Sequence, residues 1–158
     1  MWMMNNEIRP VVQQDLEALK EVIISTDLFP VEELDEMISD YLENPTSDQI
    51  WMAFILNKVP VAFAFCSPEK FTDGTYNLLA IAVLPKHQGL GIGQQLVKQV
   101  EELLAAKQKR VLIVETSSGE NFVSTRKFYQ KLGYTKEASI REFWKAGEDK
   151  VVYWKKLT

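Results

Sequence analysis

The sequence predicts a mixed α/β fold that occupies residues 1–158 as a single domain. Its 158 residues are 46% hydrophobic and 25% charged, which is enough apolar material for one sizeable core. Short apolar runs with strand character alternate along the chain with longer segments that place apolar residues at helical spacing. Beyond mid-chain, three closely spaced glycines join a strand-like run to a helix-like one. We therefore expect about six or seven strands and about four helices.

The first third of the chain is expected to hold one edge strand and two helices. Glu7 to Val12 has strand character, and Pro10 places it at a sheet edge because proline cannot donate to a ladder. A helix follows as far as Thr26, with Asp15 as its cap. The second helix, Val31 to Glu43, has an apolar face and acidic residues on its other faces, with no Lys or Arg.

The middle of the chain is expected to hold a hairpin, a third strand and a third helix. The dense apolar runs Ile50 to Leu56 and Val61 to Cys66 are separated by a short turn, which is typical of a β-hairpin. Tyr76 to Val83 is again strand-like. The segment Gln88 to Gly93 then opens a helix whose basic end lies near Lys107 to Arg110, where cations suit the helix dipole.

The last third is expected to complete the sheet around a fourth helix. Val111 to Glu115 is a short β-branched run, typical of a buried strand. The helix covers about Phe122 to Leu132, and Gly133 is placed to end it in a left-handed conformation. Tyr134 to Ala138 and Lys150 to Leu157 are the two late strands.

Composition excludes several function classes. The formal net charge of −4 leaves no excess of positive charge to neutralise phosphates, so nucleic-acid binding is not expected. The lone Cys66 and lone His87 exclude an internal disulfide and a usual zinc site, and no metal is expected. Cys66 lies in an apolar run and is interpreted as a small buried hydrophobe. The apolar start Met1 to Met4 is too short for a signal or membrane segment, which predicts a cytoplasmic protein without membrane contact.

The glycine segment carries the main chemical signal. Gly89, Gly91 and Gly93 leave the backbone free of side-chain bulk at the start of a helix, whose positive dipole end favours anions. This predicts a cradle for a phosphate or pyrophosphate; the alternative is a glycine-rich turn without a ligand. Gly93 is followed by Gln94 and Gln95, which excludes a Walker A loop, and a dinucleotide fingerprint lacks its third glycine.

Two motifs in this order are similar to those of the GCN5-related N-acetyltransferase (GNAT) superfamily. Gln88-x-x-Gly91-x-Gly93 matches the Arg/Gln-x-x-Gly-x-Gly/Ala signature, and Ile81 to Pro85 resembles the strand end that precedes it. The segment Thr125-Arg-Lys-Phe-Tyr-Gln-Lys-Leu-Gly-Tyr134 resembles the second signature of the family. The resemblance implies a mostly antiparallel central sheet that splays between its fourth and fifth strands, and N-acetyltransferase activity.

The resemblance also implies acetyl-CoA as co-substrate. The loop amides would hold its pyrophosphate, and main-chain groups at Ile81 and Val83 would pair with its pantetheine arm. The implied cofactor-binding residues are Ile81, Ala82, Val83, Gln88, Gly89, Leu90, Gly91, Ile92, Gly93, Gln94 and Phe128. Many family members carry Asn at the position of Phe122, so a side-chain bond from there is in doubt, and Asn121 is instead a candidate helix cap.

Two residues are candidates for proton transfer. Tyr129 occupies the position of a family tyrosine that protonates the departing CoA thiolate; the alternative is an aromatic residue of the helix's apolar face beside Phe128. Glu115, at the end of a buried strand, is the candidate base. Its alternative role is structural, either as a cap of the loop Thr116 to Gly119 or as a partner of Arg126.

The acceptor is expected to be a primary amine of a small molecule or a protein. The acidic helix favours a cationic amine, whereas Arg141 could hold a carboxylate. In the family, acceptor sites use regions that hold here Phe29, Glu32, Glu33, Arg141, Phe143 and Trp144. Two other functions stay open: a non-catalytic CoA-binding sensor or interaction domain, and an acyltransferase that uses a longer acyl-CoA. The resemblance also allows a homodimer, because dimers are common in the family.

Overall fold

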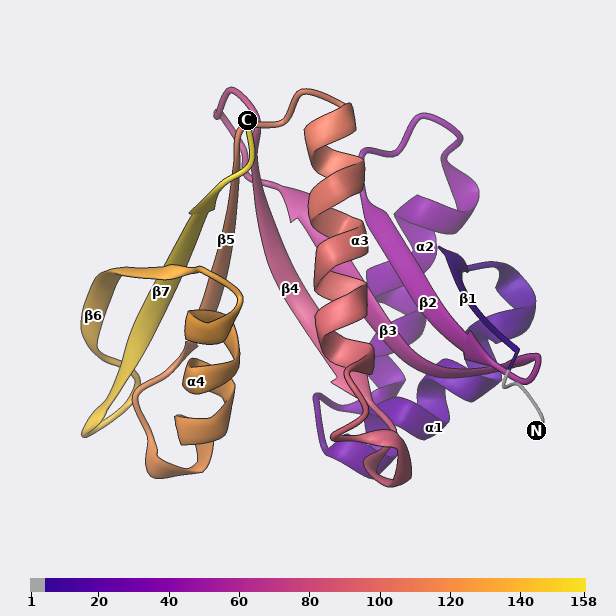
Figure 1. Ribbon diagram of the computed structural model, residues 1–158, viewed down its shortest axis with the longest axis horizontal. Helices are drawn as coiled ribbons and strands as arrows, with labels where there is room; N and C mark the ends of the chain where they lie inside the picture. The colour runs from indigo at the N-terminus through magenta and orange to yellow at the C-terminus, as the bar shows by residue number, and fades with distance from the viewer. Residues whose placement is uncertain (1–4) are drawn as a thin grey trace. The chain divides into compact units, whose positions relative to one another are not determined.

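A computed structural model describes residues 5–158, which form two compact units (Figure 1). Unit 1 holds the described residues as far as Ser67 together with Ala80–Leu103. Unit 2 holds Pro68–Leu79 and Leu104–Thr158. The strand β4 (Thr75–Val83) and the helix α3 (Ile92–Ala106) each contribute residues to both units.

The strands follow the order β1-β2-β3-β4-β5-β7-β6 in one seven-stranded sheet. The pairs β1–β2, β2–β3, β5–β7 and β6–β7 are antiparallel, and β4–β5 is parallel. This parallel pairing joins only Thr75–Asn77 to Val111–Ile113, although each strand continues beyond those residues. The expected mixed, mostly antiparallel sheet with a splay at the fourth and fifth strands is therefore confirmed.

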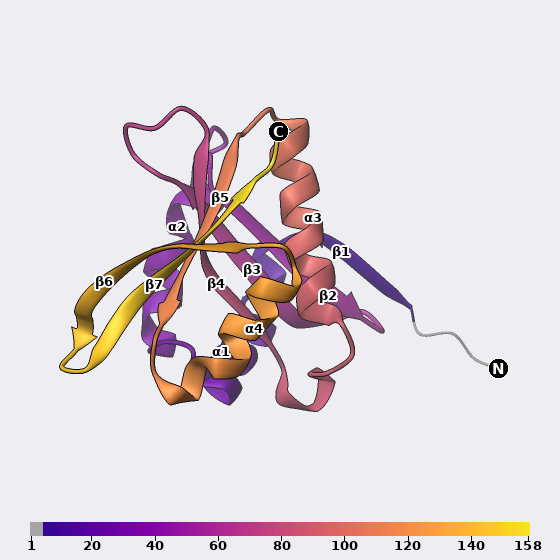
Figure 2. The same ribbon diagram turned by 60° about the vertical axis from the view of Figure 1, so that its left-hand side comes forward.

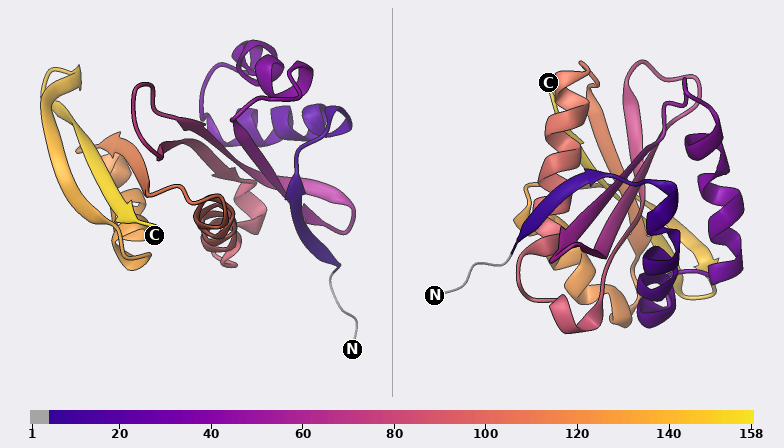
Figure 3. Two further views of the ribbon diagram at one scale, coloured as in Figure 1. Left: turned by 90° about the horizontal axis from the view of Figure 1, so that it is seen from above. Right: turned by 90° about the vertical axis from the view of Figure 1, so that its right-hand side faces the viewer.

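Unit 1 is built on β1 (Asn6–Pro10), β2 (Ile50–Leu56) and β3 (Val59–Pro68), with the helices α1 (Leu16–Thr26) and α2 (Leu34–Glu43). Single 3-10 turns precede these helices at Gln13–Asp15 and Val31–Glu33. Within this unit α1 and α2 lie on one face of the strands and α3 on the other (Figure 3). The apolar faces predicted for the helices pack into a core that contains Trp51. The Trp51 ring is stacked on the rings of Phe65 and Phe63, with ring centroids 4.1 and 6.0 Å away.

The predicted hairpin is present, with a tighter turn than expected. Asn57 and Lys58 alone connect the strands, and both are left-handed, with φ of 50° and 71°. Two successive left-handed residues match the twist of paired strands, which is why such turns are favoured in hairpins. The expectation that β3 begins at Val61 is wrong, because Pro60 already lies opposite Ile55, beside a shift in register.

Unit 2 contains β5 (Val111–Ser117), the 3-10 turn Glu120–Phe122, α4 (Val123–Lys131), β6 (Thr135–Lys145) and β7 (Glu148–Lys156). Gly133 has a φ of 89°, which confirms the left-handed residue expected after the fourth helix. The expectation that the sixth strand ends at Ala138 is wrong. The strands β6 and β7 form a long hairpin that continues to Lys145 (Figure 2).

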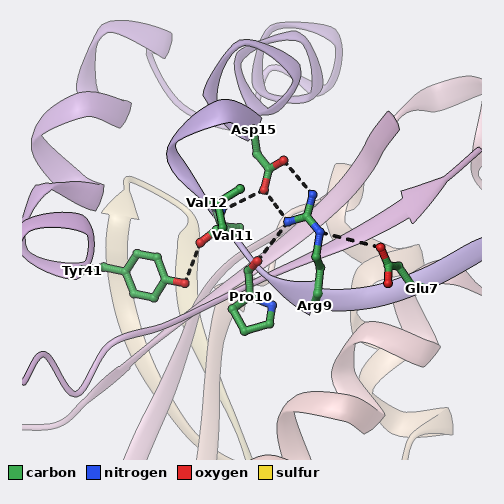
Figure 4. Close-up of polar contacts among 7 residues, drawn as sticks. All are labelled: Glu7, Arg9, Pro10, Val11, Val12, Asp15 and Tyr41. Carbon is green, nitrogen blue, oxygen red and sulfur yellow. Dashed lines mark hydrogen bonds and ion pairs between the residues drawn. The ribbon is translucent and has the colours of Figure 1, made fainter. Parts of the chain in front are cut away.

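The start of α1 differs from the expected cap. The carboxylate of Asp15 makes no cap bond to that helix; it accepts the backbone N–H of Val12 at 2.9 Å and so closes the preceding turn (Figure 4). The Arg9 guanidinium donates to both carboxylate oxygens, at 2.7 and 3.0 Å. Burial opposes ionisation, but the bonds from Arg9 and Val12 outweigh it and lower the pKa of Asp15. The hydroxyl of Tyr41 donates to the Val11 carbonyl at 2.7 Å, which ties α2 to the same corner.

Candidate active site

The predicted cradle lies in unit 1, between the end of β4 and the start of α3. A 3-10 turn, Pro85–His87, leads from the strand into the segment Gln88 to Gly91, and α3 begins at Ile92. The side-chain amide of Gln88 donates to the Val83 carbonyl at 3.0 Å, so the first residue of the motif fixes the loop to the strand that precedes it. The sequence therefore places a strand, a short loop and a helix start where the motif requires them.

Two glycines of the loop have a conformation that other residues rarely adopt. Gly89 and Gly91 have φ values of 80° and 82°. A Cβ atom at Gly89 would meet nothing within 4 Å, and one at Gly91 would meet only Gln95 Nε2, at 4.0 Å. The need for glycine thus comes from the backbone conformation, and the space beside this backbone is open.

The electrostatics of the loop suit an anion. The first N–H groups of α3 have no acceptor within the helix, and their dipoles add to a positive end. No acidic residue lies in the first turn of α3 to oppose a negative ligand. The open backbone and the helix start together fit the pyrophosphate of a CoA ester.

The end of β4 can offer a ligand mainly its backbone. The residues Ile81 and Val83 are half-buried, whereas Ala82 is buried in the core of unit 1. The Ala82 side chain therefore packs inward, and only the main chain at this position is left for a cofactor. Since an extended ligand pairs with main-chain groups, this arrangement suits one that lies along the strand.

Tyr129 lies in unit 2, on α4, within a cluster of aromatic rings. Its ring meets Phe128 and Tyr134 edge to face, with centroids 5.1 and 5.6 Å apart, and lies 6.1 Å from the ring of Tyr153. The residue is only 2% exposed. The ring thus belongs to the apolar face of the helix, and the packing holds the phenol in a defined position.

Glu115, on β5, forms an ion pair that the sequence did not reveal. Its Oε2 atom lies 2.7 Å from Nζ of Lys150 on β7, and this ammonium also lies 4.3 Å from the ring centroid of Phe143. The suggestion that Arg126 pairs with Glu115 is wrong. The Arg126 guanidinium donates instead to the carbonyls of Ser117 and Gly119, at 2.7 and 2.9 Å. The register of β5 against β7 brings Glu115 and Lys150 together, and register cannot be read from charges alone.

The loop after β5 is fixed by bonds to the β6–β7 hairpin. The Ser117 hydroxyl donates to Glu148, and this bond lowers the pKa of the Glu148 carboxyl. Ser118 exchanges two bonds with the backbone of Asp149, at 2.7 and 3.0 Å. The indole of Trp144 donates to the Thr116 carbonyl at 3.1 Å. Asn121 lies inside the turn Glu120–Phe122 and makes no cap bond, so its suggested role as a cap is wrong.

The candidate acceptor residues fall into two groups, one in each unit. In unit 1, Phe29 packs half-buried against the core, and Glu32 and Glu33 are exposed. In unit 2, Arg141, Phe143 and Trp144 lie exposed on β6, and the two aromatic rings meet edge to face at 4.7 Å. Each group presents an aromatic side chain together with charge.

Three further features of residues 5–158 concern metal-ligand clusters, the lone cysteine and membrane-spanning helices. No group of three or more His, Cys, Asp or Glu residues in this part of the chain could hold a metal ion. Burial raises the pKa of the Cys66 thiol far above its usual range, so this side chain behaves as a small hydrophobe. No helix within the described residues is long and apolar enough to cross a membrane.

Comparison with known families agrees with the geometry of the loop. The sequence profile of the acetyltransferase (GNAT) family matches residues 16–134, a stretch that includes the glycine loop, Glu115 and Tyr129. The chain belongs to the GNAT family. It is therefore an acyltransferase that uses acetyl-CoA, as the motifs implied. No curated protein sequence matches the chain.

Solved structures of GNAT proteins share the whole fold. A structure from Desulfovibrio desulfuricans assigned to the GNAT acetyltransferases is 30% identical, with a TM-score of 0.88 over 98% of this chain and 100% of its own. The ribosomal-protein-S18-alanine N-acetyltransferase of Escherichia coli is 17% identical, with a TM-score of 0.77 over 98% of this chain and 95% of its own. The yncA protein of Salmonella typhimurium, solved with acetyl-CoA, is 17% identical, with a TM-score of 0.78 over 97% and 94% of the two chains.

Proposed function

We propose that this GNAT protein transfers an acetyl group from acetyl-CoA to a primary amine of a small molecule or a protein by direct attack. The observation that carries the proposal is the open loop in which Gly89 and Gly91 adopt left-handed conformations at the start of α3. Acetyl-CoA, when bound, supplies the acetyl group as an activated thioester. The loop amides from Gln88 to Gln94 would hold the pyrophosphate, and the backbone at Ile81 and Val83 would pair with the pantetheine arm.

Tyr129 is proposed as the general acid. Its phenol would donate a proton to the departing thiolate as negative charge develops on sulfur. The contacts with Phe128, Tyr134 and Tyr153 support this role, because a ring held by packing presents its hydroxyl without a further loss of rotamer freedom. Phe128 contributes to the cofactor side of the site in this proposal, by supporting the Tyr129 ring.

Glu115 is proposed as the general base, with Lys150 as a positioning residue. The ion pair occupies Oε2 of Glu115, so the other carboxylate oxygen is the one that would accept the amine proton. The side chain of Glu115 is 27% exposed, which leaves it accessible to an acceptor. The structural alternative is that the pair only joins β5 to β7, and the effects of substituting each partner distinguish the two roles.

The two units are proposed to act as one domain. The family profile begins at residue 16, in unit 1, and ends at residue 134, in unit 2, so neither unit alone carries the whole match. A cytoplasmic location stays a prediction of the sequence.

Release of CoA thiol in the presence of acetyl-CoA and a panel of amines tests this function. The panel should contain polyamines, amino sugars and peptides with a free N-terminus or lysine, since all present a primary amine. We expect thiol release with at least one class and none with the matching N-acetylated amine. Binding of acetyl-CoA without release from any amine would favour the sensor function, and release only from longer acyl-CoA donors would favour a different acyl group.

A further inference from the structure

The loop between β3 and β4 carries an aromatic residue that the proposed reaction does not use. Phe71, in unit 2, is 105% exposed and has a φ of 65°. A left-handed backbone is unfavourable for a residue of this size and has a conformational cost. An entirely exposed ring recovers no burial energy against that cost. Within a single copy of the chain, Phe71 therefore destabilises its loop and makes no apolar contact that offsets the backbone strain.

The same loop is held firmly in this conformation. The backbone N–H of Glu69 donates to the Thr75 carbonyl at 2.8 Å, and the Thr72 hydroxyl donates to the Glu69 carbonyl at the same distance. The side-chain amide of Asn77 donates to the Glu69 carboxylate at 2.8 Å. At the base of the loop, Arg110 donates from Nε to the Asp73 carbonyl at 2.6 Å and from its backbone to the Gly74 carbonyl at 2.8 Å. The ring is thus presented by a fixed loop, as in a pre-organised binding anchor.

A hollow lies beside the base of this loop, also in unit 2. It has a volume of about 530 Å³ and is lined by Arg110, Val111, Trp154, Lys156 and Thr158. Because Arg110 both lines the hollow and bonds to the loop, the Phe71 loop and the hollow adjoin. The loop and the C-terminal residues also lie at the same end of unit 2 in both Figure 1 and Figure 2.

The loop and the hollow complement each other in chemistry. The hollow offers the indole of Trp154 and the aliphatic Val111, which suit a phenyl ring. Its two cations are Arg110 and Lys156, whereas the loop carries the exposed Asp73 two residues after Phe71. No hydrogen bond or ion pair within the described residues reaches the carboxylate of Asp73 or the ammonium of Lys156. Each can therefore pair with an opposite charge from outside the chain.

We propose that two copies of this chain associate through this surface, with Phe71 of each copy inserted into the hollow beside Trp154 of the other. The anchor and its receptor lie next to each other on one chain, so a two-fold axis between them satisfies both at once and closes the pair. Asp73 then faces the partner's Lys156. A second copy fits better than an unrelated protein, because it supplies an exposed aromatic anchor, a hollow for one and both charges in a single contact.

Sedimentation velocity over a wide range of protein concentration tests the proposal. The wild-type chain should sediment as a dimer of twice 18.2 kDa. Phe71→Asn removes the ring but tolerates the left-handed backbone, and we expect it to weaken dimerisation at least about tenfold. Ile24→Asn is the matched control, since Ile24 is an exposed apolar residue of α1 in unit 1, and it should dimerise as the wild type does.

A charge exchange tests the arrangement within the pair. Asp73→Lys and Lys156→Asp should each weaken dimerisation, and the two substitutions combined should restore much of it, because each contact then again joins opposite charges. A monomeric wild type, a Phe71→Asn variant that dimerises as tightly as the wild type, a mass that grows beyond the dimer, or a combined variant no better than the single ones would overturn the proposal. These variants leave the glycine loop unchanged, so acetyl-CoA binding reports on the proposed function separately.

Discussion

Lys150 and Glu115 form a 2.7 Å ion pair that joins β7 to β5 at the end of the sheet where the proposed base lies. The Lys150 ammonium also lies over the Phe143 ring, so one cation links a carboxylate to an aromatic side chain of β6. Because the Lys150 side chain is only 14% exposed, water cannot readily replace the missing partner if either residue is substituted.

Glu115→Gln should lower turnover by about 10²-fold and leave acetyl-CoA affinity nearly unchanged, because general base catalysis typically contributes this much. Steady-state kinetics at saturating amine, together with a binding titration, measure the two effects. Lys150→Met is the comparison, since it removes the partner and keeps the carboxylate, so turnover should fall less than in Glu115→Gln. If Glu115→Gln turned over like the wild type and only melted earlier, Glu115 would be a structural residue.

Tyr129→Phe should lower turnover by roughly 10²-fold with little change in acetyl-CoA affinity, because it removes the proposed acid and keeps the ring that packs in the cluster. Tyr153→Phe removes a hydroxyl from the same cluster and serves as the control. The acid role predicts a large fall in thiol release for Tyr129→Phe alone. Equal falls in both variants would point instead to a general disturbance of the packing.

Asp15→Asn should destabilise the fold by about 2–3 kcal/mol at pH 7, because it breaks a bidentate pair whose carboxylate is almost fully buried. The folded-state pKa of Asp15 lies below its unfolded value, so the ionised carboxylate stabilises the fold above about pH 4. This contribution is lost as the pH falls through the lower, folded-state pKa. Melting curves of wild type and variant should therefore converge in acid. Glu17→Gln, which removes an exposed carboxylate from a 3.6 Å pair, should change the melting temperature little at any pH.

The Cys66 thiol should resist alkylation in the folded protein, because its side chain is fully buried and burial raises its pKa. Labelling by a thiol reagent with and without denaturant measures this. Cys66→Ala should retain the rate of acetyl transfer, with a stability cost of about 1 kcal/mol for the small cavity. Loss of turnover in a folded Cys66→Ala variant would show that the thiol takes part in the reaction.

The sequence was most informative where a backbone requirement restricts the residue type. Gly133 was predicted correctly as a left-handed residue after a helix, because that conformation excludes most other residues. Gly89 and Gly91 were predicted as glycines for their lack of side-chain bulk, whereas the structure shows that both also have a left-handed backbone. The length of β6 was not predictable, since every residue of this edge strand is exposed and an exposed strand needs no apolar alternation.

The ion-pair partners of charged residues also could not be predicted from the sequence. Asp15 follows a typical capping pattern, but it pairs with Arg9 of a neighbouring strand. Glu115 meets Lys150 only because β5 and β7 pair in one particular register. Both contacts depend on the tertiary arrangement, which residue spacing along the chain does not determine.

Isothermal titration of the protein with acetyl-CoA tests the central claim most directly, because the claim rests on the loop from Gln88 to Gly93. The wild type should bind with one site per chain. Gly91→Val should lose at least about tenfold in affinity, since valine disfavours the left-handed backbone that presents the loop amides. Gly147→Val imposes a similar strain, at a φ of 79° in the β6–β7 turn, and should bind as the wild type does. No binding by the wild type, or equal affinity in Gly91→Val, would contradict the account.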